Sequence, residues 1–173
     1  MPARPDVLLA TCAEFPDGDE DDARLQAALR DRGLDTRWAV WDDPAVPWAD
    51  AGLVVIRATW DYARRHDEFL AWAGGVPRLR NPADVVRWST DKRYLADLAA
   101  AGVPTVPTRF VAPGENGDLP AGEVVVKPGV SAGSRDTARH PADQAGAEVA
   151  AVDAAEERPR VQRARVVPAG EPA

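Results

Sequence analysis

The stretch LVVIRATWDY, residues 53–62, indicates the fold class of the chain. Its first four residues are all apolar, a pattern typical of a strand that is buried on both faces of a parallel sheet. This strand is predicted over residues 53–59, and residues 6–11 and 36–41 predict two earlier strands. Three such strands, with helices expected between and after them, favour an α/β fold.

Helix signals lie where this fold needs them. The acidic residues 17–22 suit a helix start, because negative charge is favourable at the positive end of the helix dipole. Gly33 supplies a C-cap for that helix. A second helix is predicted over residues 64–73, closed by Gly74 and Gly75. The order of these elements predicts a small doubly wound parallel sheet.

The second half of the chain shows weaker patterns. The sequence predicts a helix capped by Ser89 or Thr90 and ended by Gly102, with a stiff proline-containing connector after it. Two strands and an alanine-rich helix are then expected, over residues 108–111, 123–127 and 141–157.

Composition narrows the class of protein. The net charge of −7 argues against a nucleic-acid partner. The sequence has neither a run of about eighteen apolar residues nor a signal-peptide pattern, so we expect no membrane partner and a cytoplasmic location. Cys12 is the single cysteine, which excludes an internal disulfide and predicts an inert thiol. His66 and His140 match no metal-binding spacing.

Only two of the 21 basic residues are lysines, Lys92 and Lys127. Lysine differs from arginine where a compact, movable charge must meet phosphate oxygens, although chance survival of two lysines is the alternative. Lys127 ends an apolar strand and precedes a loop of small residues that could approach an anion closely. An ordinary surface loop is the alternative. The candidate loop residues are Gly129, Ser131, Ala132, Gly133 and Ser134.

Lys92 is expected in the first turn of its helix. A cation there costs about 0.3–1 kcal/mol against the helix dipole, which Asp91 would partly offset. The local sequence leaves two interpretations open: a solvated lysine held by Asp91, or a lysine that turns toward a nucleotide.

A second group of candidates lies at the carboxyl end of the strand at residues 53–59, where ligands bind in open α/β sheets. Arg57 could bind a substrate carboxylate through two hydrogen bonds. Asp61 could hold an amine or cap the following helix, and Thr59 and Tyr62 share the segment. Trp60 and Trp88 could wall a pocket, but packing in a core or an interface is the favoured interpretation for tryptophan here.

Several segments resemble the ATP-grasp family. NP at residues 81–82, STDKRYL at 89–95 and AGVPTVP at 101–107 are similar to the family's first ATP-lysine helix and the turn after it. EVVVKP at 123–128, with its Gly/Ser loop, is similar to the second lysine strand and phosphate loop. The string RATWDY at 57–62 is similar to one in relatives of the cycloserine-forming cyclo-ligase, within the glutathione-synthetase-like branch.

The resemblance implies an organisation of the chain. Residues 1–80 would form a pre-ATP-grasp α/β substrate domain, and residues 81–140 a partial α+β ATP-grasp subdomain. Lys92, Lys127 and the Gly/Ser loop would bind ATP, and Arg57 would serve the substrate and catalysis. Residues 141–173 would be a helix and a poorly ordered tail, for which we hypothesise a truncation or frame shift. Reading the downstream DNA in its other two frames tests this hypothesis.

The resemblance also implies a reaction. ATP with Mg²⁺ would phosphorylate a small carboxylate, such as that of an amino acid or peptide, and an amine or thiol would attack the acyl phosphate. The sequence contains no recognisable acidic Mg²⁺ strand, so we expect weak nucleotide binding and no ligation by the chain alone. A non-catalytic α/β binding module and an inactive fragment are the alternatives. The substrate, the nucleophile and the oligomeric state stay open.

Overall fold

The computed structural model describes residues 4–111, 122–141 and 164–166. The chain divides into two compact units, Met1–Arg87 and Trp88–Ala173. Each unit is described by itself.

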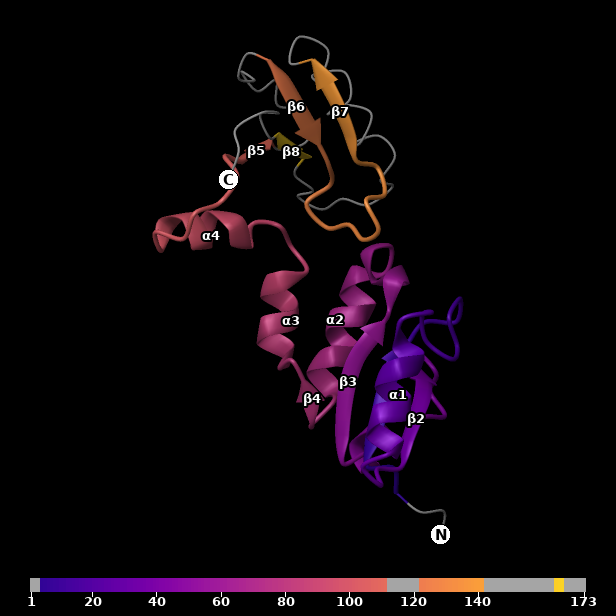
Figure 1. Ribbon diagram of the computed structural model, residues 1–173. Coiled ribbons are helices and arrows are strands. Elements are labelled where there is room, and N and C mark those ends of the chain that lie inside the picture. Colours follow the sequence, from indigo (N-terminus) through magenta and orange to yellow (C-terminus); the bar gives the residue numbers. More distant parts are fainter. Residues whose placement is uncertain (1–3, 112–121, 142–163, 167–173) are drawn as a thin grey trace. The chain divides into compact units, whose positions relative to one another are not determined.

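The first unit is built on a parallel sheet of four strands, in the order β2-β1-β3-β4 (Figure 1). This arrangement confirms the predicted α/β class, and the three predicted strands are present, each one residue shorter than expected. The elements are β1 (Val7–Thr11), α1 (Asp22–Arg30), β2 (Thr36–Val40), the 3-10 helix η1 (Trp48–Asp50), β3 (Leu53–Ala58), the 3-10 helix η2 (Trp60–Ala63), α2 (His66–Gly75), β4 (Leu79–Arg80) and α3 (Ala83–Ser89), which crosses the division between the units.

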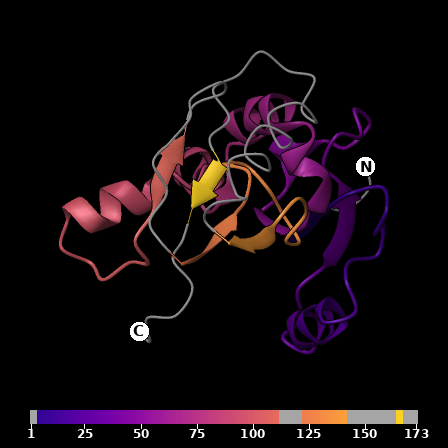
Figure 2. The same cartoon turned by 90° about the horizontal axis from the view of Figure 1, so that it is seen from above.

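Helices α1 and α2 cover opposite faces of this sheet (Figures 1 and 2). The chain runs from β1 through α1 to β2 on one side of β1, and β3 then pairs on the other side. The direction of winding therefore reverses between β1 and β3. In open α/β sheets, ligands bind at the carboxyl ends of the strands that flank such a reversal.

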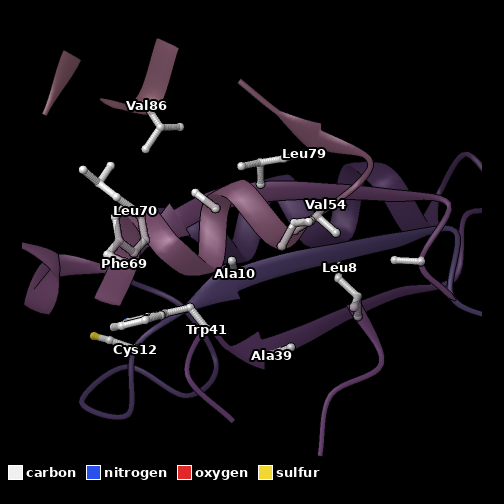
Figure 3. Close-up of a cluster of buried hydrophobic side chains, with 13 residues drawn as sticks. Leu8, Ala10, Cys12, Ala39, Trp41, Val54, Phe69, Leu70, Leu79 and Val86 are labelled. Atoms are coloured by element: carbon white, nitrogen blue, oxygen red, sulfur yellow. The ribbon is translucent and has the colours of Figure 1, made fainter. Parts of the chain in front are cut away.

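The core of the first unit lies between the sheet and α2, where side chains from all four strands meet the helix (Figure 3). Alternate residues of β1 point to this face, because successive side chains of a strand point to opposite faces. Phe69 of α2 is fully buried, and its ring contacts Trp41, Trp72 and Tyr62 at centroid distances of 5.4, 5.4 and 5.5 Å. Cys12 is buried in the same cluster.

The second unit contains helix α4 (Tyr94–Ala100) and four short strands. β5 (Arg109–Val111) pairs antiparallel with β8 (Ala164–Val166), and β6 (Glu123–Val126) pairs antiparallel with β7 (Ala138–Pro141). Among the described residues, no helix is long and apolar enough to cross a membrane.

The helix predicted from a cap at Ser89 or Thr90 is wrong at its start. Ser89 is the last residue of α3, and α4 begins only at Tyr94, after an N-cap at Arg93. Between the helices, the Asp91 carboxylate accepts the backbone N–H of Arg93 at 2.9 Å. Aspartate side chains compete with helical hydrogen bonding in this way, which favours a turn.

The predicted helix over residues 141–157 is wrong at its first residue, because Pro141 ends strand β7. The remainder of that prediction lies outside the described residues. The sequence patterns also gave no prediction of η1, η2, β4, α3, β7 and β8. Each of these is seven residues or shorter, and a segment of that length carries little periodic signal.

Candidate functional site

Arg57 occupies an irregular position in the first unit, at the carboxyl end of β3. The register pairs Ala10 with Ile56 and then Thr11 with Ala58, so Arg57 is the extra residue in a β-bulge. The backbone N–H of Cys12 donates to Ala58 O at 3.2 Å just beyond it. Bulges are frequent next to active sites, where they redirect a side chain. This one lies between the two strands that flank the reversal of winding.

The partner of Arg57 is Asp22, the first residue of α1. Arg57 Nε donates to Asp22 Oδ1 at 2.7 Å, and Nη2 donates to the same oxygen. The other carboxylate oxygen of Asp22 accepts the backbone N–H of Asp19 at 3.1 Å. The sequence analysis interpreted Asp22 only as part of an acidic helix start. Nothing in the local sequence reveals a partner 35 residues away.

Asp61 is already bound by protein groups. Its Oδ1 accepts the indole N–H of Trp41 at 2.9 Å, and its Oδ2 lies 3.8 Å from Arg65 Nη1. The guanidinium of Arg65 stacks over the Trp41 ring at 4.6 Å and also pairs with Asp42 and Glu68. The side-chain hydrogen bonds to Glu68 and to Asp42 raise the pKa of Arg65 above its usual value. This network fixes the segment that follows β3.

The other candidates after β3 differ in exposure. Thr59 is buried, and the ring of Tyr62 packs against Phe69. Trp60 is 47% exposed, and its indole N–H donates to Asp19 Oδ2 at 3.2 Å. Trp60 is therefore not part of the core.

Trp88, in the second unit, is also exposed rather than packed in a core. Its ring contacts Tyr94 at a centroid distance of 5.2 Å, and its indole N–H donates to Asp97 Oδ2 at 2.7 Å. The indole therefore packs against the start of α4, and Trp88 is not part of a core.

In the second unit, Lys92 reaches the loop that follows β6. Its ammonium donates to Ser131 Oγ at 2.6 Å and lies 3.3 Å from Ser131 O and 3.5 Å from Gly129 O. The backbone N–H of Lys92 also donates to Gly129 O, at 2.9 Å. Lys92 lies before α4 rather than in its first turn, so the expected conflict with the helix dipole does not arise.

Lys127 directly follows β6 and is half-buried at the start of the same loop. Further along, Gly133 and Ser134 both have left-handed backbone, with φ of 60° and 57°. A Cβ added at Gly133 would meet nothing within 4 Å. Ala132 accepts the backbone N–H of Arg135 at 3.2 Å, which closes the turn. The loop is therefore a tight turn with open space beside its glycine.

These residues fit a polyphosphate in chemical type, since they combine a lysine ammonium, a serine hydroxyl and backbone N–H groups. A site for Mg²⁺ is not evident in the same way. Within the described ranges, no group of three or more His, Cys, Asp or Glu side chains is arranged to hold a metal ion.

The chain is similar to known proteins in sequence and in fold. Residues 7–81 match the family model described as D-cycloserine synthetase DcsG, N-terminal domain. The structure is similar in fold to an ATP-grasp RimK domain protein from Sphaerobacter thermophilus, with a TM-score of 0.62 at 20% identity over 99% of this chain and 65% of that one. Residues 7–81 are thus similar to the N-terminal domain of DcsG, and the structure shares the fold of an ATP-grasp protein.

The chain is also similar to DcsG in sequence and in structure. The chain is 42% identical over 135 residues to the cycloserine biosynthesis protein DcsG of Streptomyces lavendulae, which covers 70% of this chain and 45% of that protein. It also matches the crystal structure of D-cycloserine synthetase DcsG, with a TM-score of 0.79 at 36% identity over 94% of this chain. The chain spans less than half of the curated relative and 58% of the solved one.

Proposed function

We propose that this chain carries the substrate domain and the ATP-lysine region of an ATP-dependent carboxylate–amine or carboxylate–thiol ligase. The observation that carries the proposal is the contact of the Lys92 ammonium with the loop after β6. A lysine that precedes one helix is thereby bound to the loop that begins at the other lysine, Lys127. The matches to DcsG and to an ATP-grasp protein support the same class of activity.

In this proposal the nucleotide phosphates lie against the loop containing Gly129, Ser131, Ala132, Gly133 and Ser134. The Lys92 ammonium exchanges its carbonyl contacts for phosphate oxygens and keeps the hydroxyl of Ser131 as a neighbour. Lys127 supplies a second positive charge. Stabilisation of developing charge by such fixed cations is usually a large part of catalysis in phosphoryl transfer.

Arg57 has the substrate role, with Thr59, Asp61 and Tyr62 fixing the segment around it. Its guanidinium is proposed to bind a small carboxylate, such as that of an amino acid or a peptide. The carboxylate oxygen attacks the γ-phosphorus of ATP, ADP leaves, and an acyl phosphate forms. An amine or thiol then attacks the acyl carbon and inorganic phosphate leaves. Mg²⁺ would supply charge neutralisation on the phosphates when bound.

The expected behaviour of the 173-residue chain is weak ATP binding without ligation. Isothermal titration calorimetry with ATP, ADP and AMP tests the first part, and we expect affinity to fall in that order as phosphates are lost. If a small carboxylate binds with an affinity that does not depend on nucleotide or Mg²⁺, the chain is instead a non-catalytic binding module. Multi-turnover release of ADP and phosphate with a coupled amino acid would contradict the second part. The cytoplasmic location stays a prediction from the sequence.

A further inference from the structure

The ion pair between Arg57 and Asp22 is asymmetric in exposure. The Asp22 side chain is 3% exposed, whereas that of Arg57 is 40% exposed. Burying a carboxylate is unfavourable unless its oxygens are hydrogen-bonded. Here one oxygen accepts the guanidinium and the other accepts the backbone N–H of Asp19. Asp22 is therefore held by the protein from two directions, while its partner remains open to solvent.

The geometry of the pair leaves part of the guanidinium unused by Asp22. Nε and Nη2 both donate to Asp22 Oδ1. A guanidinium has five N–H donors in a rigid planar fork, so this pair uses two of the five and leaves three. Because the fork is planar, fixing Nε and Nη2 also fixes the direction of the remaining donors.

The backbone adds a second constraint. Arg57 is the extra residue of the bulge between β1 and β3, so its Cα is set by the sheet, and Asp22 is set by the start of α1. A long arginine side chain normally loses considerable rotamer freedom when it binds a ligand. Here that freedom is already restricted before any ligand arrives.

We infer that Asp22 is a positioning residue, which holds the Arg57 guanidinium in one orientation so that its remaining donors bind a substrate carboxylate. The inference rests on the proposed role of Arg57 and adds to it a residue that does not touch the substrate. Binding by a prearranged group costs less ordering free energy.

In the test, D-serine is titrated into the full chain and into each variant, and its binding affinity is measured by calorimetry. The wild-type chain is compared with Asp22→Asn and with Arg57→Ala. Asp21→Asn is the matched control, because Asp21 is an exposed neighbour whose side chain makes no cap hydrogen bond. D-serinol, which lacks the carboxylate, controls for the ligand. Urea unfolding verifies that each variant is folded, and ATP affinity is measured in parallel.

We expect Asp22→Asn to weaken D-serine binding about tenfold, the effect of one charged hydrogen bond. Asp21→Asn should change it less than about twofold. Adding Asp22→Asn to Arg57→Ala should have little further effect, because the aspartate acts through the arginine. ATP affinity should stay unchanged, which a general loss of structure would not allow.

Two results distinguish a failure of the positioning role of Asp22 from a failure of the substrate role of Arg57. If Arg57→Ala weakens D-serine binding and Asp22→Asn does not, the positioning role is overturned and the proposed function stands. If Arg57→Ala binds D-serine as tightly as the wild type, or if the wild type binds none, the substrate role of Arg57 fails and the inference fails with it.

Discussion

Gly18 and Gly33 both have left-handed backbone, with φ of 86° and 77°, but their surroundings differ. A Cβ at Gly18 would lie 2.4 Å from a ring carbon of Trp38, whereas a Cβ at Gly33 would meet nothing within 4 Å. The turn between β1 and α1 therefore needs glycine both for its left-handed backbone and for the space beside Trp38. The end of α1 needs glycine for its left-handed backbone alone. The sequence predicted Gly33 as a helix terminator, but it could not reveal a contact between Gly18 and a tryptophan twenty residues away.

These glycines give a prediction with an internal control. Gly18→Ala should destabilise the first unit by about 2–4 kcal/mol, since backbone strain and overpacking each cost about 1–3 kcal/mol. Gly33→Ala should cost only about 1–2 kcal/mol, from strain alone. Urea unfolding followed by tryptophan fluorescence measures both. Equal losses for the two variants would contradict the described contact with Trp38.

The sequence predicted which residues are candidates for chemistry, but it did not predict which residues they contact. Arg57 was found because it follows an apolar strand, and Lys92 and Lys127 because they are the only lysines. The pairing of Arg57 with Asp22 depends on how α1 packs on the sheet. The contact of Lys92 with Ser131 joins positions 39 residues apart. Such pairs arise from tertiary structure, and local sequence patterns do not encode them.

At the level of elements, the parallel strands were predictable and the short helices were not. Continuous apolar runs identify β1 and β3 because both faces of these strands are covered. Helices α3 and α4 have seven residues each, and the turn between them depends on Asp91. A single helix was expected in that region because Tyr94, Leu95 and Leu98 have helical spacing that conceals the break before them.

Helix α2 anchors the core of the first unit through Phe69. Phe69→Ala should destabilise this unit by about 3–5 kcal/mol, because the ring is buried between Trp41, Trp72 and Tyr62. Near-UV circular dichroism should also weaken as the aromatic cluster loosens. Val85→Ala, at a side chain that is 45% exposed on α3, is the control and should shift stability by no more than about 0.5 kcal/mol. A Phe69 variant as stable as this control would contradict the packing.

At the scale of the whole molecule, the chain combines an α/β unit with a second unit that carries both lysines. The family match covers residues 7–81, while the structural match to DcsG extends over 94% of the chain. The resemblance in sequence motifs predicted this relationship. The pairing of β5 with β8 was not predicted, because the residues around 164–166 show no clear periodicity.

We propose that Lys92 and Lys127 together hold the phosphates of one nucleotide. Calorimetric titration of ATP into the wild-type chain and into Lys92→Ala, Lys127→Ala and Arg93→Ala tests it most directly. Arg93 is the matched control, since it adjoins Lys92, carries the same charge and pairs with Asp91. We predict that each lysine variant binds ATP about tenfold more weakly than the wild type, and that Arg93→Ala binds within about twofold. ATP affinity that is unchanged in both lysine variants, or reduced equally by Arg93→Ala, would contradict the claim.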